Sequence, residues 1–217
     1  MRFSTVLSRV KAGLGVSLIC LATAFAAAQS ERPVSINVGG GFSPLVGNVS
    51  NDLDNGWHIT AGAKYNATST FSIGPQFLYN GFGVPGSVLR RAGAPNGDAH
   101  VWAITADPRL QLPFSKLRPY LVGGVGYYRR TVNFTQPAVT SVTFFDPFFG
   151  YVFPGLVGTN QVLKTITRNG IGGSLGFGFG VKLGHMGTEF FTEARYHYAD
   201  TGRIPTRMIP VTFGLRF

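Results

Sequence analysis

Residues 171–183 read IGGSLGFGFGVKL and contain the clearest structural signal in the chain. Large apolar side chains occupy every second position from Leu175 to Leu183, and the positions between them hold three glycines and Lys182. A period of two residues is typical of a β-strand, because successive side chains point to opposite faces of the sheet. The stretch therefore predicts a strand with one apolar face and one small, polar face.

The same alternation recurs from residue 34 to the last residue, and no segment has a helical period. Eight strands are expected, at 34–42, 57–65, 71–80, 102–112, 118–132, 171–183, 189–198 and 209–217. The glycine-rich segment 118–132 is the one strand whose two faces the pattern leaves unassigned.

The expected connections alternate between short and long. The short ones are 66–70, 113–117 and 184–188, and the long ones are 43–56, 83–98, 133–169 and 199–206. Short turns at one end, long loops at the other and an even strand number are typical of an antiparallel up-and-down transmembrane β-barrel. Because 133–169 is long for a loop without structure, its flanks are expected to extend the two strands that it joins.

The composition excludes several classes of protein. Only 13% of the 217 residues are charged, about half the share in a soluble domain, although 19 basic against 9 acidic residues give a net charge of +10. Collagen-like, coiled-coil, disordered and disulfide-stapled chains do not have this composition. The single cysteine, Cys20, leaves no thiol for catalysis or metal binding in the rest of the chain.

Residues 1–28 are expected to be a cleavable Sec signal peptide. Arg2, Arg9 and Lys11 precede an apolar stretch at 12–25, and three alanines at 26–28 form a cleavage site. An uncleaved anchor helix is the alternative. The remaining residues, 29–217, then form one barrel domain.

Charged side chains avoid the apolar faces of the seven strands that can be assigned. A Lys or Arg that faces lipid at the middle of a bilayer costs about 2–4 kcal/mol, so this segregation favours an apolar exterior. The opposite orientation, a soluble carrier with an apolar interior, is the alternative. A polar network is therefore expected inside the barrel. Its members are Lys64, Gln76, Asp107, Arg109, Lys182, Glu193, Arg195 and Arg216, and Glu189 shares their face.

Aromatic and basic residues collect near the expected strand ends. An aromatic girdle at the two membrane interfaces is expected from Trp57, Tyr65, Tyr79, Trp102 and Tyr198. Basic side chains beside the long loops are expected to contact lipid and lipopolysaccharide phosphates rather than nucleic acid. The rim residues singled out are Arg90, Arg91, Arg129 and Arg130.

Three stretches carry a resemblance to a known family: RPYLVGGVGY at 118–127, EARYHY at 193–198 and PVTFGLRF at 210–217. With these, the chain resembles the outer-membrane β-barrel domain of the outer-membrane protein A type. The resemblance implies a Gram-negative outer membrane. It also implies that Phe217, with apolar residues at every second position before it, is the signal read by the barrel-assembly machinery. No peptidoglycan-binding domain follows the barrel, so a cell-wall tether is not expected.

Motifs for catalysis lack the context that they need. The stretch GGSLG at 172–176 matches the nucleophile elbow of α/β-hydrolases, but no helix follows it. Lipid A deacylases, which this size class resembles, have a serine two residues after a late histidine, whereas His197 is followed by Tyr198 and Ala199. The four histidines have no metal-ligand spacing and no phosphate loop is present, so no enzyme activity, cofactor or metal is expected.

The connection 133–169 is rich in aromatic residues. An aromatic surface of this size marks a contact site for an extracellular ligand, or the segment folds over the barrel mouth as a lid. The sequence therefore predicts a non-enzymatic protein with a structural or surface-interaction role in membrane integrity, adhesion or lipopolysaccharide contact. The alternatives are a narrow pore and a lipid A-modifying enzyme. The aromatic residues are Phe134, Phe144, Phe145, Phe148, Phe149, Tyr151 and Phe153.

Overall fold

The structure, a computed structural model, describes residues 33–112, 117–183 and 188–217. The expected signal peptide, residues 1–28, lies outside the described residues, as do most of the short connections 113–117 and 184–188. Within the described part of the chain, no helix has the length and apolar character to cross a membrane.

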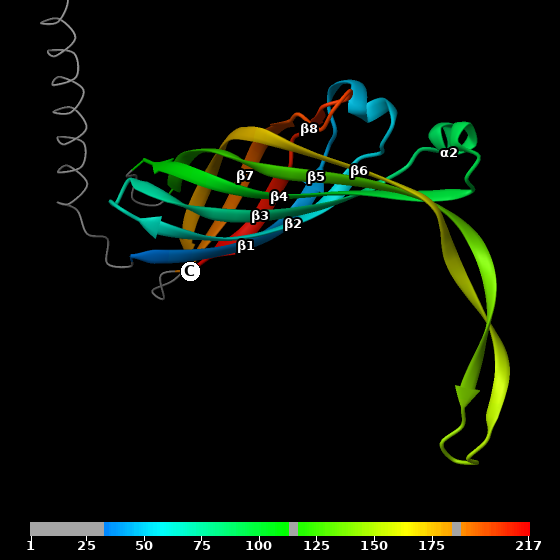
Figure 1. The fold of residues 1–217 in the computed structure, drawn as a ribbon. Coiled ribbons are helices and arrows are strands. Elements are labelled where there is room, and N and C mark those ends of the chain that lie inside the picture. Colours follow the sequence, from blue (N-terminus) through cyan, green and yellow to red (C-terminus); the bar gives the residue numbers. More distant parts are fainter. Residues whose placement is uncertain (1–32, 113–116, 184–187) are drawn as a thin grey trace, which may run out of the picture.

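Antiparallel strands form a closed barrel (Figure 1). Strands β1 to β7 each pair with the next strand in the chain, β8 pairs with β7, and β9 pairs with both β7 and β1, which closes the ring. The strands are β1 Val34–Ser43, β2 Gly56–Asn66, β3 Phe71–Gly83, β4 Asn96–Gln111, β5 Leu117–Phe145, β6 Val152–Leu183, β7 Thr188–Ala199, β8 Thr206–Met208 and β9 Val211–Arg216.

The last wall of the barrel is divided in two. One strand was expected at 209–217, but Pro210 separates β8 from β9 because proline has no N–H to donate to a ladder. The Pro210 carbonyl still accepts a hydrogen bond of 3.1 Å from the Arg195 N–H, and Ile209 donates to Pro44 across 2.9 Å. Because β8 and β9 form one wall, the eight-stranded barrel expected from the sequence is confirmed.

The two faces of the wall differ as the alternation predicts. Leu121 and Phe177 point outward and are more than half exposed, whereas the inward Asp107 is fully buried. The faces of β5, which the sequence left unassigned, follow the same rule. Tyr120 and Tyr128 point inward and Leu121 points outward.

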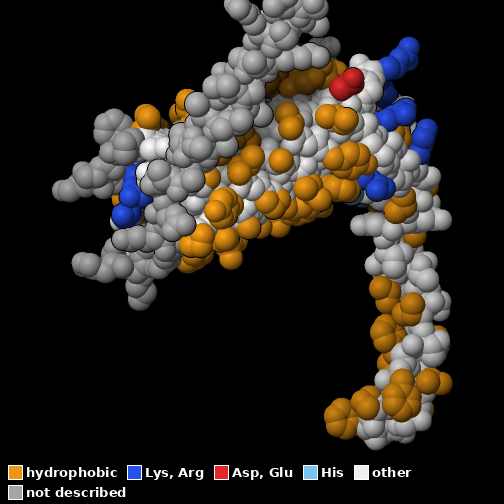
Figure 2. Space-filling model, turned by 60° about the vertical axis from the view of Figure 1, so that its left-hand side comes forward, with side chains coloured by type: hydrophobic (Ala, Val, Ile, Leu, Met, Phe, Trp, Pro, Cys, Tyr) orange, Lys and Arg blue, Asp and Glu red, His pale blue; other side chains and the backbone are white. Residues whose placement is uncertain are grey.

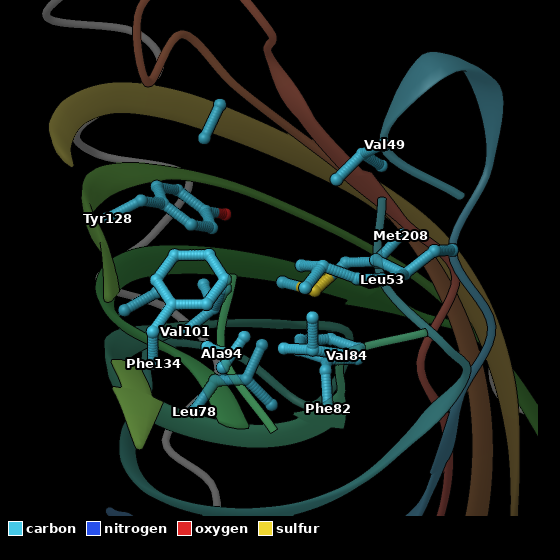
Figure 3. Packing of buried hydrophobic residues seen from close by; sticks show 14 residues of the cluster. Val49, Leu53, Leu78, Phe82, Val84, Ala94, Val101, Tyr128, Phe134 and Met208 are labelled. Atoms are coloured by element: carbon cyan, nitrogen blue, oxygen red, sulfur yellow. The ribbon is translucent and has the colours of Figure 1, made fainter. Parts of the chain in front are cut away.

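The interior is not polar throughout, which corrects the expectation of a polar lumen. Near the long loops, inward residues of β3 and β4 such as Leu78 and Val101 pack with loop residues Val49 and Leu53 and with Met208 (Figure 3). A strand can be apolar on both of its faces where both are covered. Here the long loops fold into this end of the barrel and cover the inward apolar side chains. Ionisable side chains fill the other half.

Two short helices in the long loops were not expected. The 3-10 helix η1 spans Gly47–Asn51, and the helix α2 spans Gly86–Ala92. Helix α2 is capped at its C-terminus by Gly93, whose φ of +67° allows its N–H to donate to the Arg90 carbonyl. Both helices are too short to show a helical period in the sequence.

The expected extension of the two strands around 133–169 is confirmed. Strands β5 and β6 pair from Leu117 with Val181 out to Phe145 with Val152, and a register shift lies between Phe134 and Thr135. The pairing of β4 with β5 ends at Asn96 and Thr135, so beyond this point β5 and β6 pair only with each other. We call residues 135–162 the arm. Figure 1 shows that the arm leaves the barrel at a sharp angle.

Candidate functional site

An ion-paired cluster lies in the half of the interior near the short turns. Asp107 of β4 forms an ion pair with Arg195 of β7, and Lys64 of β2 lies 3.9 Å from the Asp107 carboxylate. Arg195 also donates to Glu193 across 2.6 Å. Residues on three strands are thereby joined across the interior, where burial strengthens each interaction and makes an unpaired charge costly.

A second cluster surrounds the ring of Tyr120. Arg216 of β9 pairs with Glu189 of β7, and its guanidinium lies 5.0 Å from the centre of the Tyr120 ring. Arg109 approaches the same ring at 5.8 Å and donates to Ser72 across 3.0 Å. These contacts tie the last strand of the barrel to β3, β4, β5 and β7.

Glycines on the inward face make room for these charges. A methyl group added at Gly124 would overlap the Asp107 carboxylate, and one added at Gly180 would overlap that of Glu189. The glycine-rich pattern of β5 and β6 is therefore required by the side chains of the neighbouring strands.

A third set of contacts involves uncharged groups, and the sequence singled out only Gln76 among them. Gln76 accepts from Asn37 across 3.2 Å and donates to Thr60. Ser43 contacts His58 Nδ1 at 3.0 Å, and His58 Nε2 lies 2.9 Å from Thr212. The alternation of the sequence places Ser43 and His58 on the inward face, but it does not give the β1–β2 register that brings them together.

This Ser–His pair is not arranged for catalysis. Both side chains are almost completely buried inside the barrel, and Ser43 also donates to Asn80 across 2.6 Å. His197, which the sequence leaves without a serine two residues later, contacts the Tyr128 hydroxyl at 2.8 Å through Nδ1. No group of three or more metal-ligating side chains is found in the described residues.

A small cavity lies beside these clusters. This cavity, between Gln76, Arg195 and His197, has a volume of about 10 Å³, room for about one water molecule. A solute larger than water does not fit there without movement of the ion pairs.

Lys182 departs from the expected network. It shares the inward register and pairs with Glu189 across the β6–β7 ladder, but its side chain is exposed. It stands one residue from the end of β6, where the barrel opens to water, so the lysine needs no buried partner.

The expected girdle residues lie on the outer face. Trp57 contacts Tyr79 with ring centres 5.8 Å apart, and Trp102 contacts Tyr127 at 5.6 Å. The guanidinium of Arg207 lies 5.3 Å from the ring centre of Tyr198. Tyr65 lies near the opposite end of β2 and is exposed.

The predicted rim arginines lie on α2 and β5, at the end of the barrel from which the arm leaves. Figure 2 shows Lys and Arg side chains gathered at this end. Arg90 and Arg91 are exposed on α2, Arg129 is exposed on β5, and Arg130 donates to Thr206 across 3.2 Å.

Arg130 is the partly buried member of this group. Burial lowers the pKa of its guanidinium; Asp52 opposes this change, and Arg168 adds to it. Arg168 is its cross-strand partner in the β5–β6 ladder. Two like charges side by side favour an anion between or beside them.

The arm runs sideways from the barrel mouth instead of covering it (Figure 1), so the lid alternative is not the observed arrangement. Its turn is held by Asp146, whose carboxylate accepts from the Phe148 N–H across 2.8 Å. Phe144 and Phe153 stack with ring centres 5.8 Å apart, while Phe148 and Phe149 are exposed at the tip.

A closed antiparallel barrel that is apolar outside, ion-paired inside and belted by aromatic rings is a transmembrane β-barrel. The profile of the outer membrane protein beta-barrel domain matches residues 14–217, so the chain belongs to this family and lies in the Gram-negative outer membrane. This confirms the resemblance stated from the sequence.

Solved structures agree on the fold. Ail, the attachment invasion locus protein of Yersinia pestis, is 17% identical with a TM-score of 0.50, covering 85% of this chain and 97% of its own. Neisserial surface protein A is 14% identical with a TM-score of 0.52, covering 87% and 98%. A major outer membrane protein from Thermus thermophilus is 13% identical with a TM-score of 0.56, covering 85% and 97%. No curated protein sequence matches the chain.

Proposed function

We propose that this barrel is a non-enzymatic surface protein whose rim arginines bind phosphate groups of lipopolysaccharide. The observation that carries the proposal is the position of Arg129. It follows the belt residue Tyr127 by two positions on the outward face of β5 and is the ladder partner of the belt residue Trp102, so it lies at the edge of the lipid-facing aromatic belt nearer the long loops. Phosphates of the outer leaflet occupy this level, and arginine binds them with two parallel hydrogen bonds.

Other cations extend this surface around the mouth, and we call Arg90, Arg91, Arg129 and Arg130 the collar. Asp52 is an acidic neighbour of two collar residues, because it lies 3.8 Å from Arg91 and also acts electrostatically on Arg130. Exposed pairs of this kind contribute little energy, so the guanidinium of Arg91 stays open to an external anion. Membrane integrity then follows, because a protein that binds several phosphates links neighbouring lipopolysaccharide molecules.

The two rival functions have less support. A pore requires the buried contacts among Asp107, Arg195 and Lys64 to open, and the cavity beside them holds about one water molecule. A lipid A-modifying enzyme requires a catalytic pair on the lipid side, whereas Ser43 and His58 face the interior.

Replacement of the four collar arginines tests the proposal. Changing all four to Ser is expected to remove most of the lipopolysaccharide that co-purifies with the barrel. Changing the same four to Lys keeps the charge and is expected to retain much of it, which separates anion binding from damage to the rim. Both variants must still migrate faster on a gel when unboiled, as a closed barrel does. Unchanged lipopolysaccharide in the Ser variant, or discrete conductance of the native protein in planar bilayers, would contradict the proposal.

A further inference from the structure

In the described residues, the arm receives no strand pairing from the barrel wall. Its strands pair only with each other, from Thr135 with Val162 to Phe145 with Val152, and Gln136 donates to Gln161 across 3.0 Å on one face. A two-stranded hairpin without a third strand or a packed face is marginally stable in water. The arm therefore needs a surface that covers it.

The composition of the arm is that of a segment that avoids water. Between Arg130 and Lys164 the only charged residue is Asp146, which holds the turn. Phe148 is 91% exposed and Phe149 is 78% exposed. Exposed strand edges in soluble proteins carry charges that prevent unwanted pairing, and an exposed apolar patch without them marks a contact surface.

The direction of the arm decides between the surfaces that could cover it. Barrel strands cross the membrane, and Figure 1 shows the arm turning across their direction at the mouth. It therefore runs over the outer leaflet, and at about 3.3 Å per residue its strand from 135 to 145 reaches roughly 35 Å. Figure 2 shows its hydrophobic side chains along the side nearer the barrel and at the tip.

The base of the arm continues the lipid contact of the barrel. On the outward face of β5, Leu121 and Val125 are followed by the belt residue Tyr127 and then by Arg129. Apolar, aromatic and basic residues in this order match the depth profile of a membrane from acyl chains to phosphates. Lys164 adds a second cation where the arm begins.

We infer that the arm lies on the outer leaflet of the membrane that holds the barrel and inserts Phe148 and Phe149 into its lipid interface. Aromatic side chains are well placed there, because the interface accepts both the ring and the polar backbone of the turn. This inference concerns a different segment from the collar and does not depend on lipopolysaccharide binding.

A fluorophore at the tip tests the inference. In the full chain with Cys20→Ala, Phe148→Cys is labelled with an NBD fluorophore, and the barrel is inserted into phosphatidylcholine and phosphatidylglycerol vesicles that contain lipid with a nitroxide near the headgroup. The nitroxide lipid is expected to quench the fluorophore at position 148 strongly, whereas iodide in the buffer is expected to quench it little. Labelled Ser87→Cys on α2, an exposed position at the same rim, is the control and is expected to show the opposite behaviour.

Three results would overturn the inference. Equal quenching at positions 148 and 87 would mean that the tip stays in water. Quenching when the nitroxide lipid is placed only in separate vesicles would mean that the arm binds another membrane. A blue shift that depends on protein density and not on nitroxide lipid would mean that the arm binds a second copy of the chain. A further variant, Phe145→Ser with Phe149→Ser, carries the label at 148 without the neighbouring rings and is expected to lose most of the quenching.

Discussion

At the scale of single residues, Asp107 connects most of the ionic interior. Its carboxylate pairs with Arg195 and lies 3.9 Å from Lys64, and its backbone carbonyl accepts from the Lys64 ammonium across 3.2 Å. Removal of this carboxylate leaves Lys64 without its ion-pair partner and leaves Arg195 paired with Glu193 alone among the described residues. Loss of one partner from a buried ion pair is costly for this reason.

Asp107→Ala is therefore expected to lower the free energy of unfolding by about 3–5 kcal/mol. Urea unfolding in lipid vesicles, followed by the change in gel mobility, measures this. Asp98→Ala, at the exposed rim, is the control and is expected to stay within about 0.5 kcal/mol of the native protein. A loss no larger for Asp107 than for Asp98 would argue against the buried cluster.

Gly124→Ala is expected to destabilise the barrel by about 1–3 kcal/mol, because the added methyl group overlaps the Asp107 carboxylate. Gly158→Ala on the arm meets nothing within 4 Å and is the matched control. The same unfolding measurement compares the two variants. Similar stability of both would show that the interior has free space beside Asp107.

Alternation alone predicted which residues point inward, as it did for Asp107, Arg109 and Arg216. Their partners could not be predicted, because pairing depends on the register between strands that are distant in sequence. Ser43 and His58 meet only through the β1–β2 register, and Lys182 escapes burial only because β6 ends beside it.

At the scale of elements, the arm is separate from the barrel wall. The sequence predicted its strands from the length of 133–169 but could not predict its direction, since the register shift after Phe134 and the end of β4 pairing determine where it bends. Helix α2 was not predicted because a helix of 7 residues is set by its loop contacts and its glycine cap rather than by a repeating pattern.

Replacing residues 137–160 with Asn-Gly, so that the ladder partners Gln136 and Gln161 flank the turn, is expected to leave the barrel folded, because the arm strands pair only with each other. Asn-Gly forms the tight turn that such a hairpin requires. The shortened protein is expected to keep its heat-dependent gel shift and its unfolding midpoint in vesicles. Loss of the gel shift would show that the arm supports the barrel.

Phe217 tests the expected assembly signal. It closes the ring through hydrogen bonds with the backbone of Ile36, at 2.8 and 3.1 Å, while its own ring is exposed. Phe217→Ser keeps these backbone contacts, so it is expected to fold normally in vesicles but to accumulate poorly in the outer membrane of cells. Equal losses in vesicles and in cells would instead indicate a purely structural role.

At the scale of the whole molecule, the pairing of β1 with β9 closes a cylinder. Apolar side chains cover its outside, and the ion-paired side chains lie on the inside. The alternation predicted this orientation, but not the apolar half of the interior, because Leu78 and Val101 are buried by loop residues that no periodic pattern connects to them. The charged half and the apolar half together fill the barrel.

The two tryptophans of the chain, Trp57 and Trp102, both lie in the outer aromatic belt and report on this orientation without any substitution. In vesicles made with lipids brominated near the headgroup, their fluorescence is expected to be strongly quenched relative to unbrominated vesicles. Fluorescence that is unchanged by bromine, from a protein that stays in the aqueous supernatant, would contradict an apolar exterior in contact with lipid.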